Sequence, residues 1–376
     1  MSVHSTLKKE GISLIGQLNT MEINKIASNV SDKLSKAFPE HHLDKNSIFI
    51  AIARLNMYLA DMEDPNAQAK YFYKNDTIYF NKNMDFSDIN TLSMHECIHF
   101  LQSLKNDNGK LLRLGLYNME GTKDNGMALN EAAVQKMASI ACGMKPDTVR
   151  YYNMDFVTES PDYYPIETAL LNEIVFFTGT YPLYNSTLYS NDIFKNTFIA
   201  KSNAKTYAMV EKNFDILFEY ENKLGKEIEK LSKLVEDFNI NKIRKINSRI
   251  ADLKQIIQSK TLETQNLIMV ECFYHSLNQV KTLEDIQELE TSLLRFKNCI
   301  ITTQDYTFYD EFYSDMSHRL YEKAEFIEKY GSILQVNAVT NELTTIEDTS
   351  YGFQFFKNMF KKFKLIVEEK IREKDF

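Results

Sequence analysis

Hydrophobic positions in the first part of the chain follow two different spacings. Residues 20–38 carry apolar side chains on one face of a predicted helix, and Pro39 ends the pattern. Residues 47–62 are apolar over most of their length, which predicts a second, more buried helix. Residues 71–73 and 77–80 are instead rich in aromatic and β-branched side chains, which predicts two short strands. The pattern therefore predicts helices followed by a small sheet.

Helical spacing returns after this predicted sheet. We expect a helix at about 86–104, an extended segment at 111–117 and a helix at about 128–142 that Gly143 ends. Residues 166–178 then form a strongly apolar helical pattern. Strands surrounded by more numerous helices predict a mostly helical α+β protein.

Residues that interrupt helices become rare further along the chain. All six prolines lie between Pro39 and Pro182, and only three glycines follow residue 182. Proline-free, glycine-poor sequence favours helix, so we place a domain change near residues 180–200.

Two seven-residue apolar repeats occupy residues 217–235 and 243–257, and a break in phase separates them. They predict a coiled-coil-like helical hairpin at about 210–268, with two ordinary amphipathic helices as the alternative. The expected organisation is a domain of residues 1–182, with N-terminal helices in 1–65 and a core at about 70–143, followed by an all-helical region of residues 183–376.

Charge and cysteine content narrow the class of protein. The 44 basic and 52 acidic residues give a net charge of −8, which argues against a general nucleic-acid binder. The four cysteines form no CxxC pair, as expected of idle thiols in a reducing compartment. No segment has the pattern of a signal peptide or a transmembrane helix, so we expect a cytoplasmic protein, with export by a signal-less route as the alternative. The basic, aromatic segment 351–371 fits a core-completing helix better than a membrane-surface helix, so we expect no membrane contact.

The strongest chemical signal is the run His95-Glu96-Cys97-Ile98-His99, which reads His-Glu-x-x-His. Histidines four residues apart lie on the same face of a helix, one turn from each other, so both rings can reach one ion. Glu96 is rotated by about 100° from His95, which places it beside the ion as a base rather than as a ligand. The spacing predicts a zinc site on the helix at 86–104.

A catalytic zinc ion needs three protein ligands and one open position. His95 and His99 supply two, and Glu131, near the start of the helix at 128–142, is the candidate for the third. The alternative for Glu131 is a surface glutamate that the helix dipole favours. We expect one zinc ion per chain.

Over residues 70–143 the chain resembles the zincin metallopeptidases, in particular the glutamate-ligand branch called the gluzincins. The resemblance implies that His95, His99 and Glu131 bind zinc and that Glu96 is the general base. It also implies a small mixed sheet on the motif helix, with the substrate peptide paired along an edge strand. We assign that edge to Thr77, Ile78, Tyr79, Phe80 and Asn81.

The sequence departs from the gluzincin pattern at one supporting position. Some gluzincins carry an Asp four residues after the ligand Glu, where it bonds a ligand His; this chain has Gln135 there. A glutamine accepts an imidazole N–H without supplying a charge, which predicts a less basic ligand. Asn130 is a second candidate for this supporting role, and the candidates for stabilising the oxyanion are Tyr164, His275 and Arg319.

These observations favour a zinc-dependent endopeptidase that acts on a peptide or protein substrate. The alternative is a non-catalytic or regulatory metal-binding protein on a zincin scaffold, whose helical C-terminal half binds a protein partner. A further alternative is a toxin-like effector, which would use the same zinc chemistry to cleave a host protein.

Overall fold

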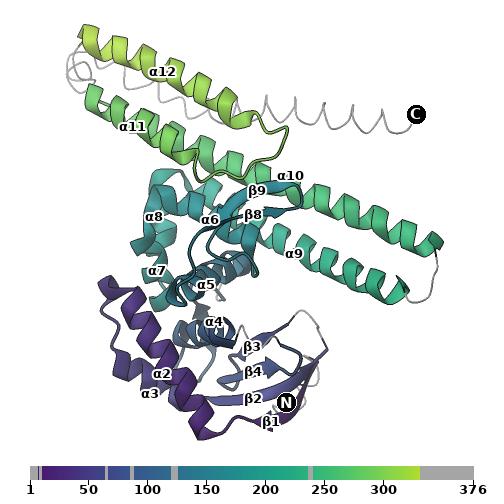
Figure 1. Ribbon diagram of the computed structural model, residues 1–376. Helices are drawn as coiled ribbons and strands as arrows, with labels where there is room; N and C mark the ends of the chain where they lie inside the picture. Colours follow the sequence, from purple (N-terminus) through teal and green to yellow (C-terminus); the bar gives the residue numbers. More distant parts are fainter. Residues whose placement is uncertain are drawn as a thin grey trace.

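The computed structural model describes residues 7, 11–63, 67–84, 89–119, 126–235 and 240–330. The fold is α+β and mostly helical, with small sheets formed by the N-terminal half of the chain (Figure 1). No helix in these described ranges is both long enough and apolar enough to cross a membrane. The basic, aromatic segment 351–371 lies outside the described residues.

The first sheet has four strands in the order β1-β2-β4-β3. Their bounds are Ile12–Gln17 for β1, Asn56–Met62 for β2, Ala69–Phe72 for β3 and Thr77–Asn81 for β4. Strands β2 and β4 run parallel, and the other pairs are antiparallel. Helices α2 (Thr20–Ala37) and α3 (Lys45–Ala53), with a short 3-10 turn at Pro39–His41, connect β1 to β2.

The predicted helix at 47–62 is wrong in its second half. Helix α3 ends at Ala53, and Asn56–Met62 form β2, which pairs with β1 on one side and β4 on the other. An apolar run of this length fits a buried strand as well as a helix. Pairing with strands on both sides decides the outcome, and the local sequence does not contain that information.

The predicted substrate edge at Thr77–Asn81 is also wrong. Strand β4 lies between β2 and β3, and all five of its residues are buried. The true edge next to the motif helix is β3, at Ala69–Phe72. The two strands of a hairpin look alike in sequence, and here the parallel pairing of β4 with the earlier strand β2 leaves β3 outside.

The two helices expected to carry the chemistry pack against each other. Helix α4 (Ile89–Leu101) contacts β3 on one side and α5 (Met127–Ala141) on another. Between them the chain forms the short strands β5 (Ser103–Lys105), β6 (Leu111–Leu114) and β7 (Tyr117–Asn118). Helix α5 is buried along almost its whole length, so its side chains hold fixed positions.

A hairpin and a further helix complete the surroundings of α5. Strands β8 (Asp147–Tyr151) and β9 (Met154–Thr158) are followed by α6 (Pro165–Thr178), which contacts α5 and ends at Gly179 with a positive φ. Two short helices follow, α7 (Thr180–Tyr189) and α8 (Ile193–Lys201).

The helices from α9 to α12 lie side by side. Helices α9 (Ala204–Val235) and α10 (Ile240–Gln279) pack along each other, and α11 (Leu283–Phe296) and α12 (Phe308–Tyr330) pack beyond them (Figure 1). One apolar core runs from α2 and α4 through α6 to α9 and α10, so it includes residues on both sides of position 183. A second cluster joins α10, α11 and α12. The contact of α9 with α5 brings the C-terminal half to the candidate site.

Candidate metal centre

The two sides of helix α4 carry different kinds of side chain. His95, Glu96 and His99 are each at most 7% exposed and share one side of the helix. Met94, Cys97 and Ile98 are fully buried in the apolar core behind them. Burial raises the pKa of the Cys97 thiol, which suits a packing residue rather than a nucleophile.

His95, His99 and Glu131 converge on one point. The Nε2 atoms of the two histidines lie 2.9 Å apart, and Oε2 of Glu131 lies 3.2 Å from His95 Nε2 and 3.3 Å from His99 Nε2. A tetrahedral ion with bonds of about 2.0–2.2 Å holds its ligand atoms about 3.3–3.5 Å apart. The triangle differs from that spacing by a few tenths of an ångström, and the three residues could hold a metal ion.

The far side of each imidazole is fixed by a glutamine. His95 Nδ1 lies 2.9 Å from Oε1 of Gln135, so Nδ1–H donates and Nε2 turns its lone pair toward the cluster. The amide nitrogen Nε2 of Gln102 lies 2.7 Å from His99 Nδ1, and Oε1 of Gln102 has no hydrogen-bond partner among the described residues. With that oxygen turned to the ring, His99 Nδ1–H donates to it and His99 Nε2 is also free to bind metal.

The charges around the cluster favour a cation. Burial opposes ionisation of Glu131, but the two adjacent histidines hold its pKa far below the usual range. Burial alone would lower the pKa of His95, and the carboxylates of Glu131 and Glu96 outweigh that effect and raise it. Two imidazoles that face an ionised, buried carboxylate form a donor set that suits a divalent ion, which binds in place of protons.

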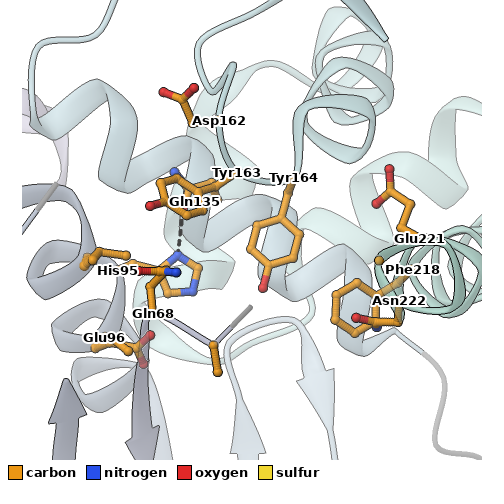
Figure 2. Close-up of a pocket in the computed structure, with 14 residues that line it drawn as sticks. Gln68, His95, Glu96, Gln135, Asp162, Tyr163, Tyr164, Phe218, Glu221 and Asn222 are labelled. Atoms are coloured by element: carbon orange, nitrogen blue, oxygen red, sulfur yellow. Dashed lines mark hydrogen bonds between the residues drawn. The ribbon is translucent and has the colours of Figure 1, made fainter. Parts of the chain in front are cut away.

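Glu96 is positioned by the edge strand. The backbone N–H of Tyr71 in β3 donates to Oε2 of Glu96 over 2.5 Å, which orients the carboxylate, and Oε1 accepts no hydrogen bond from the described part of the chain. Glu96 also lines a cleft of about 420 Å³ together with His95 and Gln135 (Figure 2). The cleft therefore opens beside His95, one of the three candidate ligands.

Tyr164 is the one oxyanion candidate that lies at this cleft. Its ring stacks on the His95 ring at 6.1 Å between centroids, and it takes a positive φ of 51° just before α6. Burial, followed by the nearby Glu131 and Glu96 carboxylates, raises the pKa of its hydroxyl, which therefore stays protonated. In Figure 2 the hydroxyl of Tyr164 points into the cleft.

The other expected residues lie elsewhere. Arg319 donates to Asp315 over 2.8 Å and lies over the Tyr274 ring, in the cluster of α10 to α12. His275, on α10, does not line the cleft. Asn130 accepts a hydrogen bond from Leu116 N over 3.0 Å, so it supports the segment after β6 rather than a histidine.

Four residues that contribute to the site were not predicted. Gln102 follows His99 by three residues, a helical spacing that could have drawn attention to it. Tyr71 acts through its backbone N–H, which no side-chain pattern reveals. Phe218 and Glu221 on α9 line the cleft from a part of the chain far from the motif.

Comparison with known protein families, curated proteins and solved structures gives no match for this chain.

Proposed function

We propose that this protein is a zinc-dependent peptidase, with His95, His99 and Glu131 as metal ligands and Glu96 as general base. The observation that carries the proposal is the triangle of three buried ligand atoms with an unused carboxylate beside it and a cleft in front. Each part of this set has a chemical task, and a structural metal site would need no Glu96.

Zinc bound there would supply a Lewis acid that polarises the scissile carbonyl and acidifies water. Glu96 accepts the proton of the attacking water at its free Oε1 and returns a proton to the leaving amine. The Tyr71 N–H holds the other oxygen of Glu96, so the base keeps its orientation through both transfers. Tyr164 donates its hydroxyl to the carbonyl oxygen as negative charge develops there.

The edge strand β3 provides a place to align the peptide. Asn81 N in β4 donates to Gln68 O, so alternate residues of β3 direct their backbone groups toward β4. Tyr71 directs its backbone N–H away from β4, toward Glu96. Ala69 lies two residues earlier in β3, so its backbone groups also point away from β4. Ala69 also lines the cleft. An extended peptide that pairs with Ala69 would pass in front of the cluster.

The test combines metal content with cleavage of a broad peptide library. We expect about one zinc per chain, cleavage that a chelator abolishes, and recovery of cleavage on adding zinc. Glu96→Gln should keep the metal and lower the cleavage rate by roughly 10³-fold or more, because it removes only the base. Glu290→Gln, on an exposed position of α11, is the matched control and should cleave normally.

Two outcomes would contradict the proposal. Cleavage that survives Glu96→Gln would exclude this base. A protein that holds one zinc but cleaves nothing in the library would instead favour a non-catalytic metal-binding protein.

A further inference from the structure

One face of α9 forms the wall of the cleft that lies across from α4. Phe218, Glu221, Asn222 and Gly225 all line the cleft, and their spacing places them on one side of a helix. Figure 2 shows Phe218, Glu221 and Asn222 on the far side of Tyr164 from His95 and Glu96. The wall thus combines an aromatic ring, a carboxyl and an amide, and Gly225 adds no side chain that would fill the space.

The charges that line the cleft have one sign. Asp162 and Glu221 are acidic, Glu96 adds a third carboxyl, and no Lys or Arg is among the lining residues. No lysine or arginine of the described ranges forms an ion pair with Glu221. Negative charge enclosed by low-dielectric walls attracts a cation more strongly than the same charge on an open surface.

A second carboxyl lies directly behind Glu221. Glu167, in the first turn of α6, is completely buried, and neither of its oxygens receives a hydrogen bond from a donor among the described residues. Its carboxyl faces that of Glu221, and burial raises the pKa of both groups. Because the two carboxyls face each other, ionising both is costly unless a cation lies against them.

We propose that this face of α9 binds the cationic side chain, Lys or Arg, of a peptide substrate, so that the protein cleaves next to a basic residue. The proposal rests on the peptidase function above and names its substrate class. Glu221 supplies the charge, Glu167 reinforces it from behind, Asn222 offers an amide oxygen, and the Phe218 ring packs on the aliphatic or guanidinium part.

The distance between the two walls suits a long side chain. The centroid of the Tyr164 ring lies 6.1 Å from the centroid of the His95 ring and 5.9 Å from the centroid of the Phe218 ring. A residue held at the cluster therefore needs an extended side chain to pass Tyr164 and reach Phe218 and Glu221. Lysine and arginine have that length and carry the complementary charge.

The test measures binding without catalysis. The Glu96→Gln protein is titrated with two fluorescein-labelled hexapeptides that differ only in one central residue, arginine or its neutral isostere citrulline. We expect the arginine peptide to bind about tenfold more tightly, and Glu221→Gln to reduce that preference to twofold or less. Glu219→Gln, an exposed position on the same helix, is the matched control and should keep the preference.

The outcomes separate this proposal from the proposed function. Equal binding of the two peptides, or a preference that survives Glu221→Gln, would overturn the basic-side-chain proposal even if the protein is a peptidase. If the arginine peptide binds more tightly and this preference depends on Glu221, but the protein cleaves no peptide, the basic-side-chain site is supported and the peptidase function is excluded. Because Gln is neutral and similar in size, Glu221→Gln should fold, and circular dichroism spectra checked against the parent protein show whether it does.

Discussion

Gln135 offers the sharpest test of how the ligand histidines are supported. Its Oε1 accepts the Nδ1–H of His95 over 2.9 Å, and its amide nitrogen donates to the Ser139 hydroxyl over 3.1 Å. Gln135 is 3% exposed, so no water replaces it readily. Gln135→Leu removes the acceptor, leaves the Nδ1–H of His95 unpaired and permits the proton to move to Nε2.

The expected loss is in metal affinity. Removing a partner of this kind weakens binding by about 10- to 100-fold. That range corresponds to about 1.4–2.7 kcal/mol, similar to the roughly 1–3 kcal/mol cost of a buried polar group left without a partner. Gln135→Glu should act in the opposite direction. One oxygen would accept from His95 and the other from the Ser139 hydroxyl, and the added charge makes the imidazole a stronger donor to metal.

The assay is competition for zinc with a chromophoric chelator at constant pH. Ser139→Ala is the control, because it alters the far side of Gln135 without touching His95 and should change the affinity less than about threefold. The reasoning is refuted if Gln135→Leu binds zinc within twofold of the parent, or if Gln135→Glu binds it more weakly, in proteins whose circular dichroism spectra are unchanged.

Three other predictions test different parts of the molecule. Tyr164→Phe should leave the metal content unchanged and lower kcat by about 10²-fold, measured by steady-state cleavage; an unchanged kcat would exclude its hydroxyl from the reaction. Gly115→Ala should destabilise the protein by roughly 2–4 kcal/mol in urea unfolding, because Gly115 has a φ of 57° and a Cβ there would collide with the side-chain amide of Gln102 and with Oδ1 of Asn130; an unchanged midpoint would refute this. Glu173 is completely buried without a hydrogen-bond donor among the described residues, and burial raises its pKa well above the usual value. The folded protein therefore keeps a proton that the unfolded chain releases as pH rises above about 4.5, so this group lowers stability at neutral and higher pH. Glu173→Gln should raise Tm at pH 8 and leave it nearly unchanged at pH 4; a rise of equal size at both pH values would contradict this assignment.

Local features of the fold were accessible from the sequence because they depend on neighbouring residues. The sequence around His95 predicted a helix that carries His95 and His99 on the same face. Gly143 predicted the end of α5, since it adopts a positive φ that suits glycine. The segments that became β3 and β4 were recognised from their aromatic and β-branched content.

Features that depend on pairing between distant segments of the chain could not be predicted from the sequence. The order β1-β2-β4-β3 is set by contacts between segments far apart, and it moved the substrate edge from β4 to β3. The same pairing turned residues 56–62 into a strand. The α9 wall of the cleft depends on the packing of α9 against α5, which no repeat in α9 indicates.

The most direct test of the central claim is the coordination of zinc in the zinc-loaded protein, measured by anomalous diffraction at the zinc edge. The account predicts one zinc ion within about 2.0–2.2 Å of Nε2 of His95, Nε2 of His99 and a carboxylate oxygen of Glu131, with the fourth position open to the cleft. A zinc ion held by other residues, or coordination that leaves out Glu131, would contradict it.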